Sequence, residues 1–254
     1  MITTEQVNQL AKQFQIDQLS VVREYIQLLV LNQLYQYEEG NKIYFKGGTT
    51  IRLIYRSARF SEDLDFSTQL ATETIANTIK KLTKDISREL LGVSITKMHK
   101  GQDTQRFRLR YHAQEQKYPL TIRLDFNKQT LTIAPSASGV TTQFPLTFIP
   151  VVMHMSPQEI LAEKIHAIYK RSKGRDVYDL WFLLSKGIQP DYALINTKLD
   201  SLRIKFNLNK FESLLMGFSV KGLQQDLRPF LPQSQRAIIG QLPQMIIDLL
   251  GMRK

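Results

Sequence analysis

The chain has 254 residues, of which 43% are hydrophobic and 22% are charged, a balance typical of a globular protein with a sizeable core. Lysine and arginine (34) outnumber aspartate and glutamate (23), so the formal net charge is +11, which favours a polyanionic partner, nucleic acid first. There is no cysteine, which excludes disulfides and thiolate sites, and the polar N-terminus and lack of a long apolar run predict a cytoplasmic protein without a membrane partner.

The first predicted elements lead to a pair of glycines. Apolar residues recur at helical spacing through residues 5–37, which predicts helical structure there. Residues 43–45 predict a short strand that leads into Gly47 and Gly48. Thr49 can then cap a following helix.

Residues 62–66 predict a strand that carries two carboxylates. Side chains alternate along a strand, so Asp63 and Asp65 point the same way while Leu64 and Phe66 point into a core. Two like charges this close favour a cation between them, and Mg²⁺ or Mn²⁺ takes oxygen ligands while keeping positions open for phosphates. The preceding glycine turn and helix start offer a close approach to such phosphates. The alternative is a solvated strand face beside an ordinary tight turn.

A helix and a hairpin follow. Residues 72–91 show one apolar stripe at helical spacing. Residues 106–111 and 121–126 alternate with period two on either side of a polar turn near residues 114–117, and residues 127–150 suggest turns with short strands. The polar face of the hairpin carries Arg106, Arg108, Arg110, Thr121, Arg123 and Asp125.

Asp125 is the best candidate for a third carboxylate. Two-metal sites share carboxylates, and one usually comes from a neighbouring strand. Asp125 lies mid-strand on the polar face, with apolar neighbours on either side. The alternative is that Asp125 only pairs with Arg106, which lies close to opposite if the turn is placed correctly.

Helices dominate the rest of the chain. Ser156 as N-cap, Pro157 at the first position and Glu159 in a capping box predict a helix that runs to about Arg171. Gly174 breaks the pattern, and a second helix begins near Arg175 and Asp176 and ends by Gly187. We therefore predict two domains, residues 1–152 with the strands and N-terminal helices, and a helical domain at residues 153–254.

The two C-terminal helices carry a charged pattern. Lys164, Arg171 and Arg175 would share one face if the helix were continuous, and Asp176 and Asp179 follow at a spacing of three. An aspartate at a helix start can cap the helix and fix an arginine. The alternative is a solvated face with ion pairs worth about 0.3–0.5 kcal/mol each.

Two long motifs resemble those of the AbiEii/AbiGii toxin family of nucleotidyltransferases. The first is KGGTTIR at 46–52 followed by RFSEDLDF at 59–66, and the second is EKIHAIYKR at 163–171 followed by RDVYDL at 175–180. Both stand in the family's order. The resemblance implies an α+β fold: a nucleotidyltransferase core with a mixed β-sheet flanked by helices, plus a helical C-terminal domain.

The resemblance also implies a function and a set of roles. Family members use a nucleoside triphosphate with magnesium, some modify the acceptor end of tRNA, and each toxin has an antitoxin encoded by a neighbouring gene. By this resemblance Asp63, Asp65, Lys164 and Asp176 are the expected catalytic residues, with Asp63 and Asp65 holding metal. The expected nucleotide-binding residues are Gly47, Gly48, Thr49, Ser61, Lys164 and Arg175. The third metal ligand, Asp125, rests on the strand pattern alone.

Two other functions stay open. The same chemistry could use a protein hydroxyl or a small molecule such as an aminoglycoside as the acceptor, although the charge of +11 disfavours a cationic substrate. A non-catalytic nucleotide- or RNA-binding protein is the other, and the intact carboxylate pair with Lys164 disfavours it.

Overall fold

The computed structural model describes residues 2–98, 104–112 and 119–251. The chain forms two compact units, residues 1–155 and residues 156–254. The first combines a sheet with helices and the second is helical, which confirms the predicted α+β class. The predicted turn near residues 114–117 lies outside the described residues.

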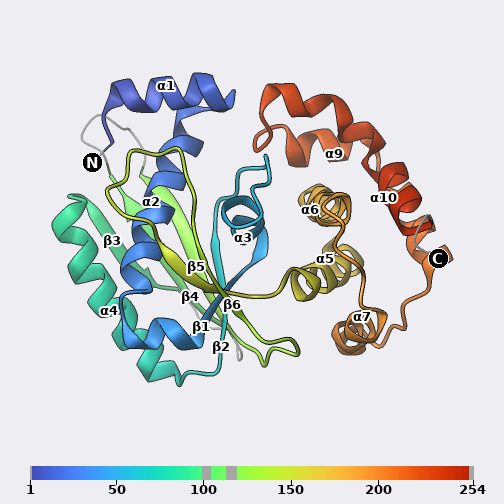
Figure 1. Ribbon diagram of the computed structural model, residues 1–254, viewed down its shortest axis with the longest axis horizontal. Helices are drawn as coiled ribbons and strands as arrows, with labels where there is room; N and C mark the ends of the chain where they lie inside the picture. Colours follow the sequence, from blue (N-terminus) through green and yellow to red (C-terminus); the bar gives the residue numbers. More distant parts are fainter. Residues whose placement is uncertain (1, 99–103, 113–118, 252–254) are drawn as a thin grey trace. The chain divides into compact units, whose positions relative to one another are not determined.

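The first unit is built on a seven-stranded mixed sheet (Figure 1). The strand order is β3-β4-β5-β2-β1-β7-β6, in which β2 pairs with β5 and β1 with β7 in parallel, and the other neighbours are antiparallel. The strands are β1 (Ile43–Lys46), β2 (Leu64–Thr68), β3 (Val93–Lys97), β4 (Thr104–Tyr111), β5 (Leu120–Lys128), β6 (Ser136–Gly139) and β7 (Val151–His154).

Helices cover one face of this sheet. Figure 1 shows α2 and α4 side by side along it, with α1 packed on α2. The apolar stripe predicted for residues 72–91 is confirmed, because Ile75, Ile79, Leu82 and Ile86 are buried. The helices of this unit are α1 (Thr4–Phe14), α2 (Gln18–Leu34), the 3₁₀ helix η1 (Glu38–Lys42), α3 (Gly47–Leu53) and α4 (Thr72–Glu89).

The helical stretch predicted over residues 5–37 is two helices. Gln15 adopts a left-handed conformation with φ of 53°, which ends α1. The Asp17 carboxylate then accepts a hydrogen bond from the Ser20 backbone N–H and starts α2. The apolar spacing continues through this break because both helices pack on the same core, so periodicity alone did not reveal it.

The register of the sheet separates an apolar row from a polar one. Phe45, Phe66 and Phe126 lie side by side on β1, β2 and β5, and the rings of Phe66 and Phe126 stack at 4.8 Å. The neighbouring row, one residue along each strand, consists of Lys46, Asp65, Asp125 and Arg106. Because side chains alternate, this polar row faces away from the aromatic core.

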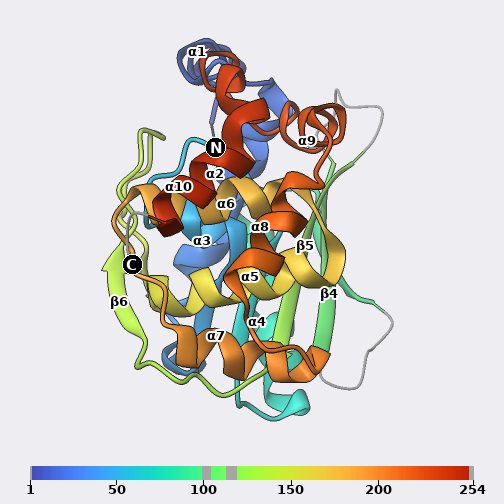
Figure 2. The ribbon, with the colours of Figure 1, turned by 90° about the vertical axis from the view of Figure 1, so that its right-hand side faces the viewer.

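The second unit contains six α-helices within its described part (Figure 2). The Ser156 hydroxyl accepts from the Glu159 backbone N–H, as predicted, but the Glu159 carboxylate binds Lys198 at 2.8 Å. No helix in the described parts of the chain is both long and apolar enough to cross a membrane. The elements are α5 (Pro157–Arg171), α6 (Gly174–Ser185), α7 (Tyr192–Leu199), η2 (Asp200–Leu202), α8 (Leu208–Met216), α9 (Val220–Leu227), η3 (Gln233–Gln241) and α10 (Leu242–Gly251).

Candidate active site

The two glycines lie where any larger residue would collide with neighbouring side chains. Gly47 has a φ of +79°, and a Cβ there would lie 2.5 Å from Asp65 Oδ2. A Cβ on Gly48 would lie 2.2 Å from Arg59 Nη2 and 3.0 Å from Ser61 Oγ. The absence of side chains thus lets this backbone lie directly against the carboxylate strand.

Thr49 does not cap the helix, contrary to the sequence prediction. Helix α3 begins two residues earlier at Gly47, with Lys46 in the N-cap position. The buried Thr49 hydroxyl instead donates a hydrogen bond to the backbone carbonyl of Asp63. Thr49 therefore ties the glycine turn to the residue that precedes β2.

Two of the three predicted carboxylates lie side by side in the sheet, and the third, Asp63, lies just before it, because β2 begins at Leu64 and not at residue 62 as predicted. Asp65 on β2 and Asp125 on β5 are direct partners in the parallel pair. Asp125 Oδ1 accepts a hydrogen bond from Arg106 Nε at 2.8 Å, so the predicted cross-strand neighbour is also confirmed as an ion-pair partner. Asp63, two residues before Asp65, accepts hydrogen bonds from the backbone and the guanidinium of Arg123.

These contacts balance charge on the acidic face. The pKa of Arg106 is raised by its hydrogen bond to Asp125, and the pKa of Arg123 by its hydrogen bond to Asp63. Across residues 2–98, 104–112 and 119–251, no group of three histidine, aspartate or glutamate side chains is arranged to hold a metal ion. Two adjacent carboxylates still suit Mg²⁺, which is usually bound by one or two carboxylates together with substrate phosphates. Asp65 and Asp125 meet that requirement in their register.

A buried polar network supports the segment around Ser61. Gln27 Nε2 on α2 donates to the Ser61 carbonyl at 3.1 Å. Arg52 on α3 makes two hydrogen bonds to Glu24, at 2.8 and 3.0 Å, and lies 3.8 Å from the centroid of the Phe60 ring. The sequence alone did not reveal this network, because its hydrogen-bonded partners are up to 34 residues apart and follow no local period.

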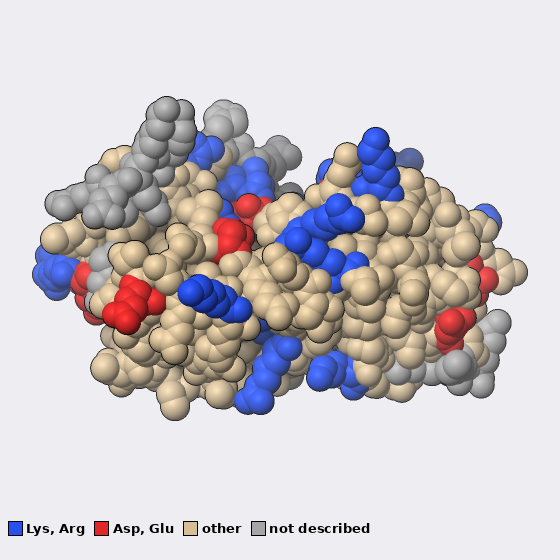
Figure 3. Space-filling model, turned by 90° about the horizontal axis from the view of Figure 1, so that it is seen from above, with Lys and Arg blue, Asp and Glu red and all other residues tan. Residues whose placement is uncertain are grey.

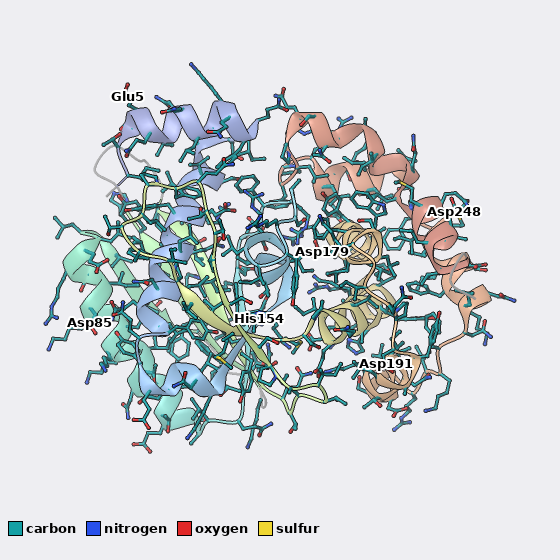
Figure 4. The ribbon with its side chains drawn as sticks, in the orientation of Figure 1. Glu5, Asp85, His154, Asp179, Asp191 and Asp248 are labelled. Atoms are coloured by element: carbon teal, nitrogen blue, oxygen red, sulfur yellow. The ribbon has the colours of Figure 1, made fainter. Side chains whose placement is uncertain are left out.

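A second charged cluster lies in the helical unit. Lys164 Nζ on α5 lies 3.0 Å from Asp176 Oδ1 and 2.7 Å from Asp179 Oδ2. Figure 4 labels Asp179 on α6. Arg171 binds Asp176 through two hydrogen bonds of 2.8 and 2.9 Å. Lys164 is 7% exposed and both aspartates 0%, so the alternative of a solvated helical face is wrong.

Arg175 does not extend a common helical face with Lys164 and Arg171. Helix α5 ends at Arg171, Ser172 turns left-handed with φ of 47°, and α6 begins at Gly174, so the continuous face imagined for the three basic residues does not form. The Arg175 guanidinium lies 5.0 Å from the centroid of the Phe230 ring. Asp176 fixes Arg171 and does not cap α6; the N–H of Gly174, the first residue of α6, donates instead to Asp226 Oδ2 at 2.8 Å.

We expect the Asp176 cluster to lose its stabilising effect in acid. Burial opposes ionisation of Asp176, but neighbouring Lys164 and the Arg171 hydrogen bonds outweigh it and hold its pKa well below the usual range. A carboxyl with a lowered folded-state pKa stabilises the fold above its unfolded pKa and loses this effect as pH falls toward the folded value. The gap in unfolding free energy between wild type and Asp176→Asn should therefore narrow steadily below about pH 4 in urea titrations. A constant gap at all pH values would contradict this.

Comparison with known proteins identifies the family. The family described as "Nucleotidyl transferase AbiEii toxin, Type IV TA system" matches residues 29–238. MenT4, the nucleotidyltransferase toxin Rv2826c of Mycobacterium tuberculosis H37Rv, has a similar structure, with a TM-score of 0.69, 19% identity, and coverage of 99% of this chain and 90% of MenT4. JHP933 of Helicobacter pylori follows with a TM-score of 0.54, 20% identity and coverage of 94% and 96%. The curated proteins include no match. The chain therefore belongs to the AbiEii family of nucleotidyltransferase toxins of type IV toxin–antitoxin systems.

Proposed function

We propose that this toxin transfers a nucleoside monophosphate from a nucleoside triphosphate to an RNA acceptor, and that the acceptor is tRNA. An RNA hydroxyl oxygen forms a bond to the α-phosphorus, the bond from that phosphorus to the bridging oxygen breaks, and pyrophosphate leaves. The proton of the hydroxyl passes to solvent or to a nearby carboxylate. Such a reaction needs groups that position the triphosphate and balance the charge that develops on pyrophosphate.

The observation that carries the proposal is the register of Asp65 beside Asp125, with Gly47 packed against Asp65. We propose that these carboxylates and Asp63 hold Mg²⁺ or Mn²⁺. When bound, such an ion would polarise phosphate oxygens and lower the pKa of the attacking hydroxyl. Arg106 and Arg123 are 40% and 48% exposed, so their contacts to Asp125 and Asp63 can exchange for another cation.

The remaining residues would handle phosphates or support the site. The backbone at Gly47 and Gly48 can approach a phosphate closely, with the Ser61 hydroxyl near the second glycine. Thr49 would act through the main chain of Asp63. We assign Lys164 to the triphosphate, by resemblance, with Asp176 as the carboxylate that orients its ammonium. Arg175 keeps its proposed nucleotide role on the same basis.

The charge of the chain supports a polyanionic acceptor. The formal net charge is +11, and the face in Figure 3 shows more area of lysine and arginine than of aspartate and glutamate. Nucleic acid is the partner that such a surface favours. We place the reaction in the cytoplasm because tRNA and nucleoside triphosphates occur there. We further propose that the antitoxin implied by the family is encoded by a neighbouring gene.

A labelling experiment tests the proposal. The purified protein is incubated with total RNA, Mg²⁺ or Mn²⁺, and each α-labelled nucleoside triphosphate in turn, and the products are separated as RNA, protein and small molecules. We expect label in a band of tRNA size that needs the divalent ion, and none when chelator is added.

The other outcomes identify the rival functions. Label in protein, or in an added aminoglycoside, with none in RNA would show that the acceptor is not RNA. The proposed nucleotidyl transfer itself would be retained. RNA or nucleotide binding without any transfer under either metal would indicate a non-catalytic protein and overturn the proposal.

Replacing Gly47 with alanine should impair transfer far more than it impairs folding. A residue with a side chain at this positive φ costs about 1–2 kcal/mol of stability. The added Cβ would also push Asp65 Oδ2 away, and a shift near 1 Å can lower a rate by about 10²-fold. The matched control is Gly187→Ala, which has a φ of +84° and no atom within 4 Å of the added Cβ. If both variants lose similar stability and similar activity, the glycine turn has no special role in transfer.

A further inference from the structure

The polar face of the sheet continues from the acidic row into a row of arginines. Arg106, Arg108 and Arg110 alternate along β4, about 6.7 Å apart, and Arg123 stands on β5. We call these four side chains the arginine stripe. Arg106 lies directly opposite Asp125, so the stripe starts at the candidate metal ligands and extends about 13 Å along β4.

The stripe contains a cross-strand pair of like charges. Arg108 and Arg123 are direct cross-strand partners, and like charges in that position repel. Arg123 binds Asp63, and Arg106 binds Asp125. Within the described parts of the chain, neither Arg108 nor Arg110 has an acidic partner. Among the described residues, these two guanidinium groups at the far end of the stripe thus have no anionic partner, and an external anion can bind them.

The side chains around the stripe are small and polar. Ser94 and Thr96 on β3 lie opposite Arg110 and Arg108, and Thr121 on β5 lies opposite Arg110. These neighbours are exposed. Modules that read RNA sequence stack bases on aromatic side chains. Because these positions of the polar face hold no aromatic ring, this surface suits phosphates and not bases.

We infer that the arginine stripe binds the backbone of the acceptor RNA next to its reacting end, and that it does so without reading the base sequence. The inference rests on the proposed RNA acceptor. The stripe leads to Asp125 and Asp65, so a strand bound along it ends at the carboxylates. The choice of acceptor RNA must then be made by other parts of the protein.

Binding assays without nucleoside triphosphate or divalent ion separate this inference from transfer itself. The probe is a short fluorescent single-stranded RNA, once of mixed sequence and once as a uridine homopolymer, titrated with the full chain at several salt concentrations. The test variant is Arg108→Gln/Arg110→Gln. The matched control is Lys80→Gln/Lys84→Gln, which removes the same charge from exposed positions of α4, on the other face of the sheet.

We expect the stripe variant to bind both RNAs more weakly by the same factor. Each lost phosphate contact lowers the slope of log affinity against log salt by about 0.7 for a single strand, so the slope should fall by about 1.4. The lysine variant should bind nearly as tightly as wild type at every salt concentration tested, with only a small loss from its lower net charge. The melting temperature of the stripe variant should stay the same or rise, because Arg108 no longer repels Arg123.

Three results would overturn the inference. The first is that the stripe variant loses no more RNA affinity than the lysine control. The two RNAs could differ in affinity in wild type and become equal in the stripe variant, which would mean that the stripe reads bases. The stripe variant could keep RNA binding and lose binding of the purified antitoxin, which would assign this surface to a protein. If wild type transfers no nucleotide to RNA but the stripe variant still loses RNA binding, the RNA-binding role of the stripe is supported and the proposed transfer reaction is wrong.

Discussion

Replacing Asp65 with asparagine is expected to lower the rate of nucleotide transfer by about 10²–10³-fold while leaving the protein folded. Asparagine keeps the size of the side chain and removes the charge beside Asp125 that would bind the divalent ion. Asp63→Asn should behave in the same way. It also removes the ion pair to partly exposed Arg123, which is worth about 0.2–1 kcal/mol of stability, so the fold should survive. Initial transfer rates and urea unfolding curves measure the two effects separately.

The control and a third variant make this result specific. Asp248→Asn changes an exposed aspartate on α10 that accepts a hydrogen bond from Gln244, and it should keep full activity. Asp125→Asn decides between a metal ligand and a partner of Arg106 only: loss comparable to Asp65→Asn supports the first. Full activity in the Asp63 and Asp65 variants would show that the metal assignment is wrong. Growth arrest on expression should follow the transfer rates.

Replacing Lys164 with methionine is expected to destabilise the helical unit by about 3–5 kcal/mol. The variant removes the ammonium that lies against both Asp176 and Asp179, each 0% exposed, while Arg171 still binds Asp176. A buried carboxylate that loses its cation is expensive, whereas removing both partners is tolerated better. Lys164→Met/Asp179→Leu should therefore recover part of the lost stability. The fluorescence of Trp181, the single tryptophan of the chain, reports unfolding of α6 directly.

A buried pair elsewhere in the same unit separates stability from function. Lys198 is 12% exposed at its side chain and binds Glu159 at 2.8 Å, so Lys198→Met likewise removes a cation from beside a buried carboxylate. Both single variants should unfold at lower urea concentration. When both are assayed at a temperature where they remain folded, only Lys164→Met should lose transfer. Equal residual activity in the two would reduce Lys164 to a structural residue.

Local patterns predicted most of the elements that hold the site. The alternation around Asp63 and Asp65 placed Leu64 and Phe66 in the core, where both are 0% exposed. The Ser156 cap fixed the start of α5, and Gly174 marked the break before α6. These signals work because capping, helical period and strand alternation depend on residues within a few positions of one another.

Contacts between distant segments were not predictable in the same way. The sequence contains nothing that places Arg59 beneath Gly48, that turns Arg123 toward Asp63, or that sets Arg175 on the Phe230 ring. Each depends on how separate elements pack. The misread cap at Thr49 has the same cause, because a tertiary hydrogen bond to Asp63 occupies its hydroxyl.

By itself, the sequence determined the α+β class, the family motifs, and the two-residue spacing that puts Asp63 and Asp65 on one face. Only the tertiary structure decided that Asp125 stands directly beside Asp65, and that Lys164 is buried between two aspartates. The physical reason is that spacing within an element follows from backbone geometry, whereas the register of parallel strands 60 residues apart is set by packing their apolar faces into one core.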